Sequence, residues 1–280
     1  MATTQQAKAP AKAKAKSTSK IGIKDAIWVI VVCAVIAFCN FFFNLGQSSN
    51  FENGDPNGSP LNIWGTIFKG GIIVPVIHTL LLTVLAMAVE RVIALSQCIG
   101  KEKLATFLGK IKADLKGLNF DAALQHCNKQ GGSVANIVRA SVMAYKEADA
   151  AVGVKKDVKL AKIQQAHEEA IAVEMPTLTM NLPIIATIVT LGTLTGLLGT
   201  VVGMIKSFQA LAQGGGGDSV ELSAGISEAL INTAFGIGTS WLAVVSYNFF
   251  TNRIDKISFA LDEIGYSIAQ TYNATHAEEA

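Results

Sequence analysis

Four stretches of the chain are long and apolar enough to cross a bilayer as helices. They cover residues 27–45, 72–89, 182–205 and 229–250, and none of them contains Asp, Glu, Lys or Arg. A helix needs about 20 residues, each rising 1.5 Å, to span the hydrocarbon core of a membrane. The pattern therefore predicts four membrane-spanning helices and an all-α, polytopic membrane helix bundle.

A different pattern fills residues 96–175. Apolar residues recur there three or four positions apart among Ala, Lys and Glu, as in Leu104, Phe107, Ile111 and Leu115. That spacing predicts several amphipathic helices outside the membrane. We expect the third span to continue this region with little interruption, so that long helices extend out of the membrane. We assign packing and oligomer contacts to the region.

Basic residues gather on one side of the predicted spans. Six lysines precede the first span, thirteen Lys or Arg lie from Arg91 to Lys162, and Arg253 and Lys256 follow the last span. The two remaining connections hold almost no cations. By the positive-inside rule, both termini and residues 96–175 are cytoplasmic. The first span follows a basic stretch, as a signal peptide would, but its length favours an uncleaved anchor.

The composition supports a membrane protein and offers no catalytic chemistry. Half of the residues are hydrophobic, 16% are charged and the mean hydropathy is +0.40. The four cysteines have neither a disulfide nor a metal-site pattern, and no pairing of a nucleophile with a base appears. We therefore expect that this protein is not an enzyme and has no catalytic residue, metal site, cofactor or nucleic-acid partner. We expect it to be embedded in the lipid bilayer.

The last two spans carry polar groups. Four glycines, Gly214 to Gly217, separate these spans, so they most simply form an antiparallel hairpin. Thr200 and Thr233 are almost equidistant from the glycines, which predicts that their hydroxyls lie at the same depth. Glu228 lies five residues closer to the outer surface, about 7.5 Å along the helix. Since polar groups in lipid usually face a partner helix or an aqueous path, these three residues indicate an ion pathway.

Small residues predict a close approach of the two spans. Removing side-chain bulk every fourth residue lets two helix backbones come together. The predicted helix-packing seam consists of Gly192, Gly196, Gly199 and Gly203 on the third span, with Gly236 and Ser240 on the fourth.

Each polar group also has a structural interpretation. A threonine in a span can bond the carbonyl one turn back and simply tolerate lipid. Glu228 can be a protonated structural carboxyl, or an interfacial one satisfied by its neighbours. A proton path needs a group that gains and loses a proton, which threonine cannot do. Because the chain has no carboxylate at mid-membrane, a proton channel here needs a partner span that supplies Asp or Glu.

The hairpin contains four motifs of a known family. They are Gly196-Leu197-Leu198-Gly199-Thr200-Val201-Val202-Gly203-Met204-Ile205, Gly225-Ile226-Ser227-Glu228-Ala229-Leu230, Thr233-Ala234-Phe235-Gly236 and Tyr247-Asn248. With these motifs the chain resembles the MotA/TolQ/ExbB proton-channel family, most closely its ExbB/TolQ branch. The resemblance implies a homo-oligomeric ring, typically a pentamer, around single-span ExbD/TolR-like partners that carry an intramembrane Asp. It also implies that Thr200 and Thr233 face the pore, that Glu228 is the pore-side glutamate, and that protons are the coupling ion.

The resemblance also divides the chain into segments. We expect a disordered basic cytoplasmic tail (1–26), an extra N-terminal transmembrane helix (27–45), a periplasmic loop (46–71), a core transmembrane helix (72–95), a cytoplasmic helical region (96–175), the core transmembrane hairpin (176–250) and a cytoplasmic C-terminal tail (251–280). The implied location is the bacterial inner membrane, with multiple spans and both termini in the cytoplasm.

The implied function is that of a proton-channel subunit in a motor driven by the proton motive force. An ExbB-like protein would energise TonB-dependent outer-membrane transport, with a TonB-like protein as a further partner. The alternatives within the family are a TolQ-like subunit of Tol-Pal and a motility-motor stator. An alternative of another class stays open, a structural membrane scaffold that conducts no ions.

Overall fold

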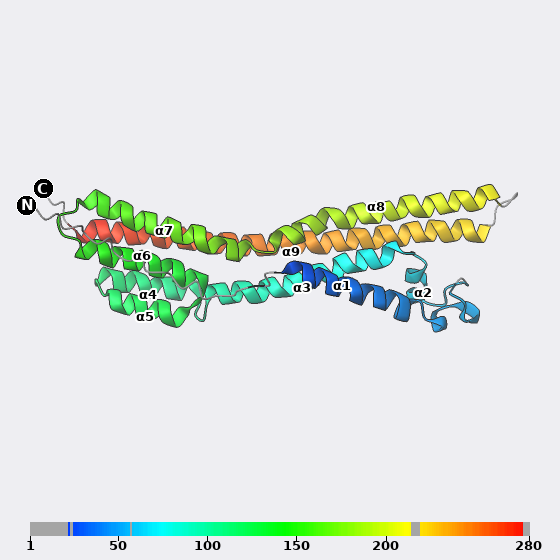
Figure 1. Cartoon of the computed structure of the whole chain (residues 1–280), viewed down its shortest axis with the longest axis horizontal. Coiled ribbons are helices and arrows are strands. Elements are labelled where there is room, and N and C mark those ends of the chain that lie inside the picture. The colour runs from blue at the N-terminus through cyan, green and yellow to red at the C-terminus, as the bar shows by residue number, and fades with distance from the viewer. Residues whose placement is uncertain (1–21, 23–24, 57, 214–218, 277–280) are drawn as a thin grey trace, which may run out of the picture.

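The computed structural model describes residues 22, 25–56, 58–213 and 219–276. In this part of the chain the regular elements are helices, and a single isolated bridge joins Phe51 and Pro60. The helices run lengthwise in an elongated molecule (Figure 1). The predicted all-α fold is confirmed, whereas most of the predicted basic tail and the four-glycine run lie outside the described residues.

Four helical segments have the length and apolar character of membrane spans, as predicted. They are α1 (Ala26–Cys39) with its π-helical end η1 (Asn40–Leu45), α3 (Ile73–Ile99), α8 (Leu182–Gln213) and α9 (Ser219–Thr275). Helices α8 and α9 lie side by side along the length of α8, α3 packs against both, and α1 packs against α3 (Figure 1).

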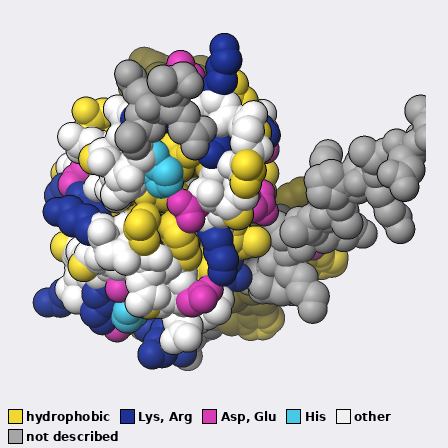
Figure 2. All heavy atoms as spheres, turned by 90° about the vertical axis from the view of Figure 1, so that its left-hand side faces the viewer, with side chains coloured by type: hydrophobic (Ala, Val, Ile, Leu, Met, Phe, Trp, Pro, Cys, Tyr) yellow, Lys and Arg dark blue, Asp and Glu magenta, His cyan; other side chains and the backbone are white. Residues whose placement is uncertain are grey.

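The opposite end of the molecule is a helical bundle. It consists of α4 (Leu104–Lys116), α5 (Phe120–Gln130), α6 (Gly132–Ala150), α7 (Lys156–Thr179) and the second half of α9. Seen end-on, this bundle exposes many Lys, Arg, Asp and Glu side chains (Figure 2). A stripe of buried residues three or four positions apart holds α9 in the bundle: Ile254, Ile257, Leu261, Ile264 and Ile268. Residues 251–275, expected as a tail, are therefore part of a packed helix.

Several titratable side chains are buried in the bundle. His167 of α7 shares a 2.8 Å hydrogen bond with the Ser141 hydroxyl and packs against Gly265 of α9. Burial lowers the pKa of His167, against smaller opposing effects of the Leu261 carbonyl and nearby carboxylates. Burial also raises the pKa of the Cys127 thiol to about 12. Both groups are therefore neutral at pH 7.

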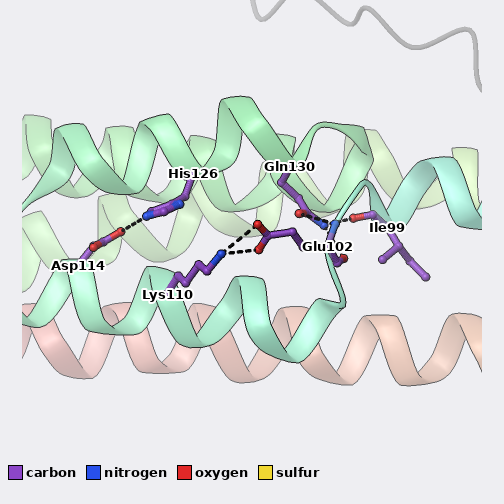
Figure 3. A network of polar contacts seen from close by, with 6 residues as sticks. All are labelled: Ile99, Glu102, Lys110, Asp114, His126 and Gln130. Atoms are coloured by element: carbon purple, nitrogen blue, oxygen red, sulfur yellow. Dashed lines mark hydrogen bonds and ion pairs between the residues drawn. The ribbon is translucent and has the colours of Figure 1, made fainter.

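Gln130 joins the bundle to the inner end of α3 (Figure 3). Its side-chain nitrogen donates to the carbonyls of Ile99 (2.7 Å) and Glu102 (2.9 Å), and its side-chain oxygen accepts from the Glu102 backbone N–H at 3.1 Å. Gln130 is buried, so these bonds are shielded from water. The side chain of Glu102 binds Lys110 at 2.7 Å, which ties the start of α4 to the same junction.

A buried ion pair marks the inner end of the apolar part of α3. The guanidinium of Arg91 is fully buried and binds both carboxylate oxygens of Glu90, at 2.5 and 2.6 Å. It also donates to the Leu178 carbonyl at 3.4 Å, near the end of α7. Helix α7 ends one residue later, at Thr179, and Asn181, with φ of 66°, interrupts the helical path before α8 begins. The expected near-continuous passage from α7 into α8 is thus interrupted by one tight break.

The segment between α1 and α3 is folded. It contains η2 (Ser48–Asn50), η3 (Glu52–Gly54) and α2 (Ile63–Phe68), and we call its described residues, 46–56 and 58–71, the outer cap. The Asn50 side chain donates to the carbonyls of Asn44 (2.8 Å) and Leu45 (3.0 Å) and accepts from the Asn62 side chain at 2.9 Å. This part of the chain, expected as a turn-rich loop, is therefore cross-linked by hydrogen bonds.

Candidate functional site

Glycines bring the backbones of α8 and α9 into direct contact. A Cβ atom built on Gly236 would lie 2.6 Å from the Cα atom of Gly196 and 2.7 Å from the carbonyl oxygen of Gly192. A Cβ atom on Gly203 would lie 2.7 Å from the carbonyl oxygen of Gly225. No side chain fits in such gaps, so glycine at these positions allows the close approach.

The other seam residues lie in the same contact. Gly199 packs against the side chain of Asn232, and Ser240 accepts a 2.9 Å hydrogen bond from the Thr193 hydroxyl of the neighbouring helix. Ser207 extends the seam outward, since its hydroxyl donates to the carbonyl of Leu222 at 3.1 Å. The seam thus runs along most of α8.

The seam also sets the register of the hairpin. A Cβ atom on Gly196 would lie 3.1 Å from the Cα atom of Gly236, and a Cβ atom on Gly199 would overlap the Cβ atom of Asn232. Thr200 and Thr233 directly follow Gly199 and Asn232 on antiparallel helices, so one residue of rise on each helix, about 3 Å in all, separates them along the axis. The two threonines therefore lie at similar but not identical depths.

Each threonine hydroxyl bonds its own helix. The Thr200 hydroxyl donates to the Leu197 carbonyl at 2.6 Å, and the Thr233 hydroxyl donates to the Ala229 carbonyl at 3.0 Å. Both side chains are half-buried. A hydroxyl that donates to its own helix still offers lone pairs, so both oxygens remain acceptors for a proton donor on another chain.

On α8, Thr200 and Lys206 lie on opposite sides of the seam. Successive helix residues are rotated by about 100°. Thr200 directly follows the seam residue Gly199, whereas Lys206 directly precedes the seam residue Ser207. The two side chains therefore leave the helix on different sides.

On α9, Thr233 and Glu228 are separated in the same way. Thr233 directly follows Asn232, and Glu228 directly precedes Ala229, both of which touch the glycines of α8. Lys206 and Glu228 bind each other, so both threonines lie on the side away from that pair. We call this side the threonine face. Sequence reasoning grouped Thr200, Thr233 and Glu228, whereas the structure brings only the threonines to one side.

Glu228 forms the centre of a polar cluster against the start of α3. Its carboxylate accepts from the Lys206 ammonium at 2.6 and 2.8 Å, and the Glu228 side chain is 9% exposed. The same carboxylate packs against Gly71, where a Cβ atom would lie 2.5 Å from it. Asn232, fully buried, donates to the Gly70 carbonyl at 2.8 Å. We call this cluster the outer clasp.

A shallow cavity of about 240 Å³ opens beside the outer clasp. Its charged lining comes from Lys69, Lys206, Glu221 and Glu228. Lys206 lies half-exposed over Glu228. Sequence reasoning missed this pair because a loop separates its members. The signal available was one lysine near the outer end of α8 and one glutamate near the outer end of α9, on the two arms of the hairpin.

The described residues hold no group of three or more His, Cys, Asp or Glu side chains placed to bind a metal ion. The four cysteines are free, and Cys98 and Cys127 are buried in helices of the inner half.

Comparisons with known proteins match the part of the chain that holds the seam. The model of the MotA/TolQ/ExbB proton channel family matches residues 133–263, which include the whole seam and both threonines. The Tol-Pal system protein TolQ of Pseudomonas aeruginosa is 33% identical over 124 residues, or 44% of this chain and 54% of that protein. A putative biopolymer transport protein ExbB homolog of Methanothermobacter thermautotrophicus is 25% identical over 199 residues, or 70% of this chain and 66% of that protein.

A third relative, the biopolymer transport protein ExbB of Salmonella typhimurium, is 34% identical over 84 residues, which cover 30% of this chain and 34% of that protein. These matches span less than two thirds of the length of each relative. The match to the family model covers the seam and part of the bundle. Residues 133–263 of the chain thus match the MotA/TolQ/ExbB proton channel family, and the relatives named here carry the names TolQ and ExbB.

Proposed function

We propose that this protein is a proton-channel subunit of an inner-membrane energiser driven by the proton motive force. The observation that carries the proposal is the threonine face, which presents two hydroxyls from two tightly packed helices. Among the described residues of the hairpin, the acidic and basic side chains near the threonines belong to the outer clasp, on the other side of the seam. The threonine face can therefore accept a hydrogen bond but cannot itself carry a proton.

The missing acid comes from another chain in this proposal. Leu197 and Met204, three and four positions from Thr200 and on the same side of α8, are large apolar residues that are exposed. This face is uncovered in the single chain and is suited to contact with other helices. We propose that copies of this chain form a homo-oligomer, a pentamer, around a single-span ExbD/TolR-like protein. An intramembrane Asp of that protein, protonated and deprotonated beside Thr200 and Thr233, moves the protons.

Glu228 has a different role in this arrangement. Bound to Lys206 and packed on Gly71, it lies at the outer end of the hairpin. We keep Glu228 in the proposed pathway as a fixed charge at the outer entrance, not as a carrier next to the threonines. Protons are the coupling ion.

The ExbB/TolQ branch allows two cellular roles. An ExbB-like subunit would energise TonB-dependent outer-membrane transport through a TonB-like protein, and a TolQ-like subunit would energise the Tol-Pal system. We propose the ExbB-like role first, with TolQ-like or stator work as the alternative. In each case both termini face the cytoplasm, in keeping with the basic residues of the bundle.

Proton flux in liposomes tests the proposal. The full chain is reconstituted with and without its single-span partner, and the double variant Thr200→Val/Thr233→Val is compared with Thr195→Val. Thr195 is a matched control, because its hydroxyl makes the same bond to its own helix, to the Leu191 carbonyl at 2.7 Å. It precedes the seam residue Gly196 and so lies away from the threonine face.

The expected result is partner-dependent flux that survives Thr195→Val and is lost in the double variant, with oligomer assembly unchanged. Equal flux in all three proteins would remove the threonine face from the pathway. An assembled complex that never conducts would favour the structural scaffold.

A further inference from the structure

The outer cap carries an apolar patch on its outside. Three neighbouring apolar side chains around the start of α2 are exposed: Leu61 by 65%, Ile63 by 69% and Trp64 by 54%. We call these three residues the cap patch. The opposite side of α2 is occupied, since Gly65 is buried and Phe68 stacks on Phe41 with ring centroids 4.8 Å apart. The patch is therefore the face of α2 left over after the cap has packed.

The cap holds this patch in a fixed position. Asn62 caps α2 by accepting from the Gly65 backbone N–H at 2.9 Å, and its side chain donates to Asn50 at 2.9 Å. The ring of Phe51 packs edge-on against Phe68, with centroids 5.5 Å apart. An ordered cap that exposes three large apolar side chains differs from a loop, whose apolar residues can turn inward. Exposed apolar clusters of this kind mark interaction surfaces.

The surroundings identify what covers the patch. Helix α2 packs directly against η1, the outer end of the first span, where Phe42 and Phe43 are 56% and 81% exposed. These phenylalanines end a membrane-spanning segment, so lipid covers them. Residues 58–68 between the charged parts of the cap contain no Asp, Glu, Lys or Arg. The patch combines a Trp with neighbouring Leu and Ile, lies at the end of a span and is free of charged residues. This composition is typical of the boundary between lipid headgroups and acyl chains.

We propose that the cap patch is immersed in the outer leaflet and anchors the outer cap to lipid. The occupant of the patch is thus the interfacial layer of the bilayer. The cap ends at Gly70 and Gly71, which contact Asn232 and Glu228 of the hairpin. The lipid contact at the patch therefore sets the depth of the start of α3 against the outer clasp.

Depth-dependent fluorescence quenching tests this inference. The chain has three tryptophans, and Trp28 and Trp241 are 70% and 66% exposed on membrane-facing helices, so Trp→Phe changes there disturb little packing. The full chain with Trp28→Phe/Trp241→Phe keeps Trp64 as its single indole. It is reconstituted in phosphatidylcholine vesicles brominated either near the glycerol end or near the methyl end of the acyl chains. Acrylamide in the water provides the third quencher.

We expect the shallow bromines to quench Trp64 roughly twofold more strongly than the deep bromines, because interfacial segments sink only about 5–10 Å into the bilayer. The variant that keeps only Trp241, in the middle of the fourth span, calibrates depth and should show the reverse order. Adding Leu61→Ser/Ile63→Ser to the single-Trp64 protein should weaken the bromine quenching and raise the acrylamide quenching.

Two results overturn the inference. Strong acrylamide quenching of Trp64 with no bromine quenching would mean that the patch faces water. Protection from all three quenchers would mean that protein covers the patch, as in a contact with a second copy. Both outcomes are independent of proton flux, so they leave the proposed channel function untouched.

Discussion

Adding one methyl group to the seam should separate α8 from α9. In Gly236→Ala the new Cβ atom would lie 2.6 Å from the Gly196 Cα atom and 3.0 Å from the Gly196 nitrogen. Ordinary contact begins near 3.4 Å, so the helices must move apart by about 0.8 Å at this level. The neighbours are backbone atoms, which cannot turn aside as a side chain can. Overpacking of this kind costs about 1–3 kcal/mol.

Gly238→Ala is the matched control. It lies two residues further along α9, is exposed and has no atom within 4 Å of the built Cβ position. Both variants gain the helix propensity of alanine, up to about 1 kcal/mol. The difference between them therefore isolates the clash at the seam, and we expect Gly236→Ala to be the less stable by about 1–3 kcal/mol.

The assay is unfolding of the detergent-purified protein by increasing amounts of SDS, followed by loss of helical circular dichroism. Reversible transitions give the free energy of unfolding of each variant under the same conditions. Equal stability of the two variants, or a more stable Gly236→Ala, would refute the claim that backbone contact at the seam holds the hairpin together.

Three further predictions concern buried groups. Glu90→Gln should lower stability by about 3–5 kcal/mol, because it leaves the buried Arg91 guanidinium unpaired, and Glu90→Gln/Arg91→Met should recover part of the loss in thermal unfolding. Burial depresses the pKa of His167, so the contribution of neutral His167 to the free energy of unfolding is complete above about pH 6.5 and is lost as the pH falls below that value. His167→Gln should therefore flatten the dependence of the free energy of unfolding on pH between pH 7.5 and 5.5. An unchanged dependence would contradict this prediction. The buried thiol of Cys127, with its pKa raised to about 12, should resist maleimide at pH 7.5 until the protein unfolds, as mass spectrometry can show.

The broad fold could be predicted because it depends on signals that are local in sequence. Uninterrupted apolar runs identified the four spans, and small residues every fourth position identified the seam that Gly196 and Gly236 form. A local signal was also present for the second half of α9. Its stripe of Ile254, Ile257, Leu261 and Ile264 has helical spacing. These residues follow the last apolar run, and the lack of a further apolar run predicts a tail there.

The parts that could not be predicted depend on contacts between distant segments. The register of the hairpin is set by which glycine meets which residue of the other helix, as Gly196 meets Gly236 and Gly199 meets Asn232. Glu228 was placed with the threonines because all three are polar, yet its partner Lys206 draws it to the other side. The folded conformation of the outer cap depends on Asn50, whose side-chain hydrogen bonds connect the end of η1 to the start of α2.

The unbroken course of α9 has a mechanical consequence. Its 57 residues run from the outer end of the hairpin into the bundle, a rod of about 86 Å at 1.5 Å per residue. A rod of that length acts as a lever, so a tilt of about 5° at its outer end would swing the far end by roughly 7 Å. Any push that a moving partner exerts beside Thr233 would thus be transmitted to the bundle, where Ile264 and Ile268 are buried against the neighbouring helices.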